Sequence, residues 1–194
     1  WSVIKRYANE RGIKIIGDIP IYVAYDSADV WANKDQFLLD EDGRPSLVAG
    51  VPPDYFSASG QKWGNPLYDW EKMKSDSFGW WRERISHMLS MFDGIRIDHF
   101  RGLESYYAIP EKDPDARNGK WMKGPGREFI DVIKECAKDK LIIAEDLGDV
   151  TKEVTDLVSY SGFPGMRVLQ FGFISEDDNP HLPHNYENNS VAYT

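Results

Sequence analysis

The sequence predicts an α/β fold in which helices cover a parallel sheet, as part of a (β/α)8 TIM barrel with long loops over its C-terminal face. Short apolar runs alternate with amphipathic runs along the chain, which is typical of parallel sheets covered by helices. Three of the apolar runs end in a carboxylate, at Asp18, Asp98 and Glu145, and functional groups at several strand ends are typical of barrels. No glycine-rich phosphate turn follows a strand, which disfavours a doubly wound nucleotide-binding sheet.

The expected elements follow one another in strand and helix order. Apolar, β-branched runs predict strands over residues 13–18, 95–100, 141–145 and 168–173, and a fifth strand begins at 190–194. Apolar residues at helical spacing predict helices over residues 1–10, 78–92, 129–137 and 154–158. Residues 75–77 and Thr151 precede two of these helices as N-caps, and Gly94 and Gly162 end them.

Two connections are too long for simple loops between a strand and a helix. Residues 24–77 and 101–126 both exceed the roughly 12–15 residues beyond which a loop usually has a function. Both follow strand ends, so we expect both over the C-terminal face. Only part of a barrel is found, because a barrel needs eight strands and typically about 250 residues. We therefore expect residues 1–194 to be an internal fragment of one barrel domain, about strands 3 to 7, with an open sheet as the alternative.

Composition excludes several classes of protein. The formal net charge is −9 and no basic run offsets it, which disfavours nucleic-acid binding. No apolar stretch approaches the roughly 20 residues of a membrane span. The single cysteine, Cys136, excludes an internal disulfide framework and a multi-cysteine zinc site. It suits a reducing compartment, and we expect a cytoplasmic protein.

Asp98 stands in the run Asp-Gly-Ile-Arg-Ile-Asp of residues 93–98, which overlaps the strand predicted over residues 95–100. Side chains alternate along a strand, so Arg96 and Asp98 face the same side, roughly 6.6 Å apart. A cation at that distance favours the ionised carboxylate, which a glycosidic nucleophile needs; a structural ion pair is the alternative. His99 follows directly and faces the other side unless the chain turns there. It is a candidate to bond a substrate hydroxyl, and a packing role is the alternative.

Glu145 emerges from the apolar run at residues 141–144. Burial raises the pKa of a carboxyl group, and a raised pKa suits a general acid that holds its proton near neutrality. The alternative is a Glu that caps the next turn beside Asp146 and Asp149. Asp18 ends another strand in the same way, and three carboxylates at strand ends are more specific than any one of them.

Residues 49–68 have a composition typical of sugar binding and show neither strand nor helix periodicity. They include Tyr55, Phe56, Trp63 and Asn65. Aromatic rings pack on the apolar face of a sugar ring, and amides bind hydroxyls. An Ω-loop packed by its own aromatic residues is the alternative.

Four blocks of sequence, in this order, resemble the 4-α-glucanotransferases, also called amylomaltases or disproportionating enzymes, of the α-amylase clan. The blocks are residues 17–23 with 26–31, 50–68, 92–102 and 142–148. The clan's nucleophile motif has an Arg two residues before an Asp, as Arg96 and Asp98 stand here. The resemblance implies a β/α barrel with elaborated loops, in proteins far longer than this chain.

The resemblance also implies roles for the candidate residues. Asp98 is expected to be the nucleophile and Glu145 the general acid/base of a retaining reaction that transfers α-1,4-glucan segments. Substrate contacts are expected from Asp18, Tyr55, Phe56, Trp63, Asn65, Arg96 and His99. Malto-oligosaccharides and other α-1,4-glucans are the implied partners, and no cofactor or metal is implied. The family's third carboxylate follows a motif whose lead-in resembles residues 190–194, so we expect residues 1–194 alone to be inactive.

Two other functions remain open from the residues. Asp18, Asp98 and Glu145 could be ligands of a magnesium-dependent barrel enzyme, since hard cations favour clustered carboxylates. Arg96 argues against that alternative, because a fixed cation repels a second one. In the other alternative the protein is a non-catalytic glucan-binding module, and the carboxylates are structural.

Overall fold

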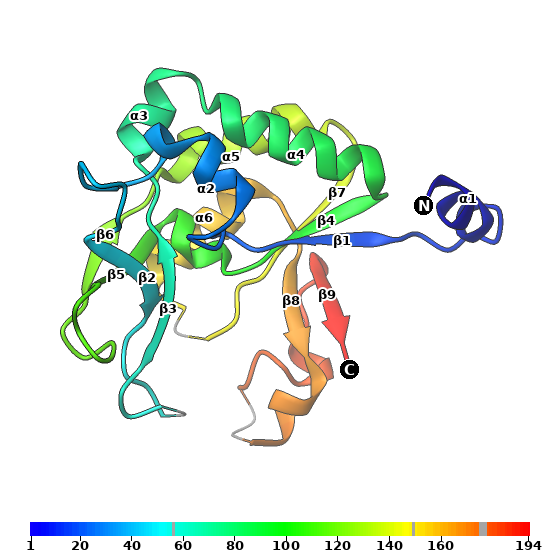
Figure 1. The fold of residues 1–194 in the computed structure, drawn as a ribbon. Helices are drawn as coiled ribbons and strands as arrows, with labels where there is room; N and C mark the ends of the chain where they lie inside the picture. Colours follow the sequence, from blue (N-terminus) through cyan, green and yellow to red (C-terminus); the bar gives the residue numbers. More distant parts are fainter. Residues whose placement is uncertain (56, 149, 175–177) are drawn as a thin grey trace.

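The computed structural model describes residues 1–55, 57–148, 150–174 and 178–194. They form a mixed α/β fold, shown in Figure 1. A parallel sheet has the order β1-β4-β7, and β8 and β9 form a parallel pair. These strands are β1 (Ile16–Ile19), β4 (Gly94–Ile97), β7 (Leu141–Ala144), β8 (Gly165–Val168) and β9 (Ser190–Tyr193). The Ala144 N–H donates to the Pro164 carbonyl (2.9 Å), so β8 begins beside β7.

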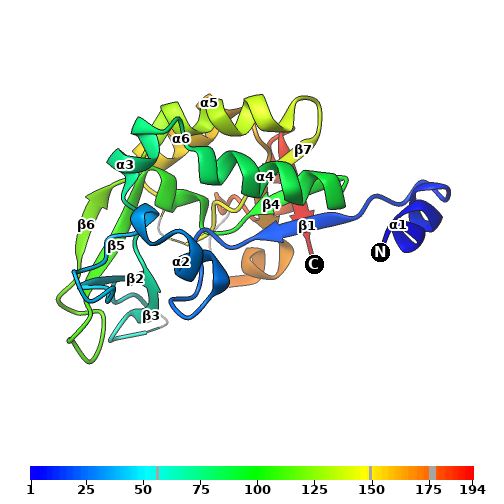
Figure 2. The same ribbon diagram turned by 45° about the horizontal axis from the view of Figure 1, so that its top comes forward.

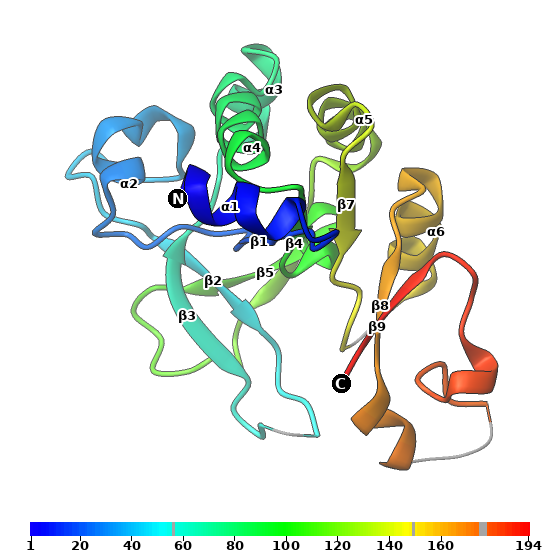
Figure 3. The same ribbon diagram turned by 90° about the vertical axis from the view of Figure 1, so that its right-hand side faces the viewer.

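Helices lie along one side of these strands, as Figure 3 shows when the molecule is viewed along the sheet. The α-helices are α1 (Ser2–Asn9), α2 (Ala28–Ala32), α3 (Trp70–Ser75), α4 (Gly79–Met91), α5 (Gly126–Ala137) and α6 (Lys152–Ser161). Short 3₁₀ helices span Lys34–Gln36, Phe100–Leu103, Leu169–Ile174 and Pro183–Asn185. In the part of the chain described, none of the helices combines the length and the apolar character that crossing a membrane requires.

The predicted helices are confirmed, but two predicted ends of the helix at residues 78–92 are wrong. Helix α4 ends at Met91, and Gly94 already belongs to β4. Thr151 accepts a hydrogen bond from the Val154 N–H at the start of α6, and Gly162 ends that helix in the left-handed conformation. At α4 neither serine of residues 75–77 is the cap. The Asp76 carboxylate between them accepts the Gly79 N–H (3.1 Å), while the Ser75 hydroxyl donates to the Lys72 carbonyl (2.7 Å).

The core lies between the parallel sheet and the helices. Ile95 and Ile97 of β4 are buried against this layer, as strand alternation predicts. Trp81 of α4 is 2 % exposed and its ring lies 5.2 Å from that of Phe129 of α5. The aromatic residues around α4 are therefore packing residues, as helical spacing predicts.

The two long connections do not remain loops, and this corrects the prediction. They form one antiparallel sheet of order β3-β2-β5-β6. Its strands are β2 (Leu47–Val51), β3 (Gln61–Pro66), β5 (Ser105–Pro110) and β6 (Lys120–Lys123). Figures 1 and 2 place this sheet beyond the ends toward which β1 and β4 point. Residues 49–68 are thus mostly a β-hairpin and not an Ω-loop.

The strand predicted at residues 168–173 is also wrong. The strand is β8, which ends at Val168, and Leu169–Ile174 is a 3₁₀ helix. Phe171 is 41 % exposed and Phe173 is 83 % exposed. An apolar run reads as a buried strand, but here much of its apolar surface remains outside the core. The strand expected at the C-terminal end is confirmed as β9.

Gly50→Ala in the full-length protein is expected to destabilise the second sheet by ~1–3 kcal/mol, the usual cost of overpacking. A Cβ at Gly50 would lie 2.1 Å from the Gln61 carbonyl oxygen of β3 and 2.4 Å from Cδ1 of Ile109 of β5. Gly79→Ala is the matched control, because a Cβ there meets nothing within 4 Å. Thermal unfolding monitored by circular dichroism should show a lower Tm for Gly50→Ala alone. Equal Tm values would mean that the strands can separate without cost.

Candidate active site

Three charged side chains meet where β1 and β4 end. The Arg96 guanidinium donates from Nη1 to Asp18 Oδ1 (2.8 Å) and from Nη2 to Asp98 Oδ1 (2.7 Å). Burial lowers the pKa of Arg96, but the two carboxylates outweigh burial and hold that pKa above its ordinary value. The prediction that Arg96 and Asp98 share a face of the strand is confirmed. The arrangement holds the carboxyl groups of Asp18 and Asp98 against one guanidinium at the strand ends.

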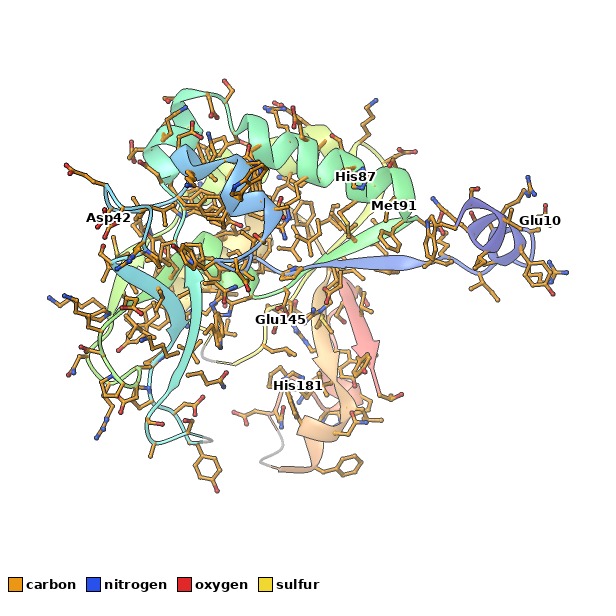
Figure 4. The ribbon with its side chains drawn as sticks, viewed as in Figure 1. Glu10, Asp42, His87, Met91, Glu145 and His181 are labelled. Atoms are coloured by element: carbon orange, nitrogen blue, oxygen red, sulfur yellow. The ribbon has the colours of Figure 1, made fainter. Side chains whose placement is uncertain are left out.

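Glu145 follows β7 and is labelled near the centre of Figure 4. Its carboxylate accepts the His99 N–H at Oε2 (2.8 Å) and the Leu147 N–H at Oε1 (3.0 Å). Burial raises the pKa of Glu145, the two peptide donors lower it, the charge of Asp98 raises it and that of Arg96 lowers it. Burial prevails, so the pKa lies above the ordinary value. This carboxyl group holds its proton at higher pH than a solvated one.

His99 occupies a turn in the chain, which the sequence left open. Its backbone is left-handed, with φ 52° and ψ 47°. Its ring packs edge-on against Trp63, with centroids 4.9 Å apart. Burial first, and then the charge of Arg101, lower the pKa of His99 to about 4, so the ring is neutral at neutral pH.

The predicted substrate-contact residues of the β2–β3 hairpin differ in their exposure to solvent. Trp63 of β3 is 37 % exposed and contacts both His99 and Tyr22. Asn65 of β3 donates its amide to the Val23 carbonyl (2.9 Å), so one of its polar groups already holds the hairpin to the chain after β1. Tyr55 is 97 % exposed. Phe56, also expected to contact substrate, lies outside the described residues.

A cavity of about 590 Å³ opens on the face of the parallel sheet away from the helices. Asp18 and Arg96 form its charged wall, and Ile16, Ile143 and Met166 are among its apolar walls. Asp18, Arg96 and Ile143 stand side by side in the strand register.

The described residues offer no obvious metal centre. Among them, no three His, Cys, Asp or Glu side chains come together in a way that could hold an ion. Arg96 occupies the position between Asp18 and Asp98 that a shared cation would need. The two carboxylates are therefore balanced by a protein cation, which disfavours the magnesium alternative.

Sequence reasoning missed three contributors to the site. Met166 of β8 accepts from Arg96 Nε at its sulfur (3.2 Å), and Leu147 supplies a peptide N–H to Glu145. The residue types of Met166 and Leu147 give no signal that would predict these contacts. Tyr22, whose ring centroid lies 6.3 Å from that of Trp63, stands inside the first block of the resemblance, so a signal for it existed.

Comparison with known proteins identifies the family of this chain. A family model described as 4-alpha-glucanotransferase matches residues 1–194. The chain is 52 % identical over 195 residues to the 4-alpha-glucanotransferase of Clostridium butyricum and 54 % identical over 197 residues to that of Synechocystis sp.. Both matches cover 100 % of this chain but only 40 % and 39 % of the relatives. The chain thus spans about two-fifths of the length of these relatives.

A solved structure supports the same family assignment. The chain superposes on the amylomaltase of Streptococcus agalactiae, solved in complex with acarbose, with a TM-score of 0.95 and 45 % identity. The match covers 100 % of this chain and 39 % of that one. Since the family model matches the chain from end to end, the chain belongs to the 4-alpha-glucanotransferase family.

Proposed function

We propose that the protein containing these residues is a retaining 4-α-glucanotransferase, which moves segments of α-1,4-glucan to an acceptor glucan or to glucose. One observation carries the proposal. Asp98, held by Arg96 and 43 % exposed at its side chain, is followed by a peptide N–H that binds the partly buried carboxyl group of Glu145. A retaining reaction needs one ionised and one protonated carboxyl group close together, and burial favours the protonated form of Glu145.

The roles follow from these environments. Asp98 attacks the anomeric carbon, while Glu145 gives its proton to the glycosidic oxygen and the leaving glucan departs. Glu145, now ionised, takes the proton of an incoming sugar hydroxyl, whose oxygen displaces Asp98 from the same carbon. Two inversions give net retention, and the carboxyl groups are predicted to lie roughly 5–5.5 Å apart.

The substrate class rests on the hairpin and on the family. Trp63 beside His99, and Tyr55 near the tip, offer aromatic surface to a chain of sugar rings. An acceptor held there would exclude water from the glycosyl-enzyme, which favours transfer over hydrolysis. The Streptococcus agalactiae relative was solved with acarbose, which supports an α-glucan site.

We also propose that β1, β4, β7, β8 and β9 are consecutive strands of a (β/α)8 barrel, with residues 1–194 forming part of that single domain. Strands β1, β4 and β7 pair in parallel in chain order, and β8 pairs in parallel with β9. Helix α4 leads into β4, α5 into β7 and α6 into β8. The ends of these strands carry the charged residues, as in barrel enzymes.

The proposed partners are malto-oligosaccharides and other α-1,4-glucans, and the proposed location is the cytoplasm. The location rests on the single Cys136, which suits a reducing compartment. The net charge of −9 disfavours nucleic acid as a partner.

The test is incubation of the full-length protein with maltotriose. Glucose together with maltopentaose and longer oligomers is the expected result, because each transfer shortens one chain and lengthens another. A parallel reaction with EDTA should proceed at the same rate. Loss of activity with EDTA and recovery with Mg²⁺ would favour the magnesium alternative, and binding without any turnover would favour the non-catalytic module.

A further inference from the structure

The hydrogen bonds between β4 and β7 shift by one residue just after Asp98. The Glu145 N–H donates to the Ile97 carbonyl (3.1 Å). In a regular parallel ladder, the Glu145 carbonyl would then accept from the His99 N–H. Instead it accepts from the Phe100 N–H (3.1 Å). The His99 N–H is thereby released from the ladder and donates to the Glu145 carboxylate (2.8 Å).

The left-handed backbone of His99 produces this shift. Residues in that conformation insert an extra position into a ladder, as in a β-bulge. The turn is closed by the Gly102 N–H, which donates to the His99 carbonyl (2.9 Å). A residue with a Cβ adopts φ near +50° reluctantly, so the surroundings must hold it there.

The His99 ring supplies that support. It packs against Trp63, and a Cβ placed on Gly102 would lie 3.1 Å from its Cδ2, so the ring fills the space beside the turn. Its Nε2 is buried and has no hydrogen-bond partner among the described residues. The pKa of about 4 means that the ring is neutral and packs without bringing a charge beside Arg101.

We propose that His99 is a positioning residue, whose left-handed turn aims the peptide between Asp98 and His99 at Glu145 and so sets the spacing of the two carboxyl groups. The peptide N–H follows Asp98 directly, so a single peptide plane links the proposed nucleophile to the proposed acid. The inference rests on the proposed function. This role of His99 differs from a substrate contact, because His99 acts through its backbone and not through its imidazole ring.

The test compares His99→Gly with His99→Ala in the full-length protein. Both variants remove the ring, but only Ala disfavours the left-handed turn. We expect kcat/KM for maltotriose to be about tenfold lower in His99→Ala than in His99→Gly, a fraction of the 10²–10⁴ that general acid catalysis contributes. Lys138, exposed at the end of α5, also has a positive φ, with φ 54° and ψ −110°. It is the control for a positive φ away from the site: Lys138→Gly and Lys138→Ala should have equal activity.

Two further readouts separate positioning from simple damage. Losing an N–H donor to the ionised carboxylate raises the pKa of Glu145, so the alkaline limb of kcat/KM should move to higher pH in His99→Ala and less in His99→Gly. Arg96 of β4 and Asp98, just after that strand, are the charges that act on Glu145, and both variants leave them in place. With α-maltosyl fluoride, whose departure needs little protonation, the initial release of fluoride should differ less between the variants.

Equal losses of kcat/KM in His99→Gly and His99→Ala, with no shift of the alkaline limb of the pH profile, would overturn the inference. That result would indicate that the ring itself contacts substrate. A wild-type protein without glucan transfer would instead overturn the proposed function. The two failures are distinguishable, because the first needs an active wild type. Circular dichroism of each variant checks that the fold is retained.

Discussion

Asp98→Asn in the full-length protein is expected to lower kcat/KM for maltotriose by about 10⁵-fold, within the range found when a covalent nucleophile is removed. The amide is nearly the same size but cannot attack the anomeric carbon as an anion. Arg96 keeps Asp18 as a partner at 2.8 Å, so the strand ends should stay together. Initial rates of glucose release measure the loss.

Asp18→Asn is the matched control for that variant. Asp18 shares the Arg96 guanidinium with Asp98, so the substitution removes a similar ion pair. Its effect should be far smaller, because it leaves the proposed nucleophile intact. Comparable losses in both variants would mean that the ion-pair network, and not nucleophilic attack by Asp98, limits the reaction.

Glu145→Gln is expected to lower kcat for maltotriose by about 10³-fold, inside the 10²–10⁴ contribution of general acid–base catalysis. A sugar is a poor leaving group and needs the proton that Gln cannot give. Both carboxylate oxygens of Glu145 accept peptide N–H groups, whereas Gln offers one acceptor oxygen. The amide therefore also loses one of the two positioning contacts.

An activated donor separates the chemistry of the two residues. With α-maltosyl fluoride, Glu145→Gln should still form the glycosyl ester, because fluoride leaves without a strong acid. The second step lacks its base, so the ester should accumulate. Mass spectrometry of a peptic digest should locate the maltosyl group on Asp98. A label on another residue would show that the roles are assigned wrongly.

Much of the parallel sheet and of its strand-end carboxylates could be predicted because the signals are local. Ile95 and Ile97 alternate with Arg96 and Asp98, and the structure keeps that alternation, with the isoleucines buried and the charged pair in contact. Glu145 ends an apolar strand, and its pKa is raised by burial as expected. The roles of these residues in catalysis stay predictions.

Local signals also gave wrong predictions, and the clearest case is the strand expected at residues 168–173. Residues 169–173 are mostly apolar but form a 3₁₀ helix with Phe173 83 % exposed. Apolar runs of this length do not distinguish strand from helix, and the burial of a run depends on which elements surround it. The sequence of the run therefore determines neither its secondary structure nor its burial.

The sequence by itself determined the order of parallel strands and helices, the charged strand ends and the family, because apolar periodicity and motifs act over a few residues. Only the tertiary structure decided that the two long connections form one sheet. Its central pairing joins Val48 of β2 to Ile109 of β5, and β2 is buried at three successive positions, so it shows no alternation. The contacts of Glu145 were equally hidden, because they come from peptide N–H groups that nearly every residue carries. Which N–H is free to bind a carboxylate depends on the left-handed turn at His99, and that turn is fixed by packing against residues distant in the chain.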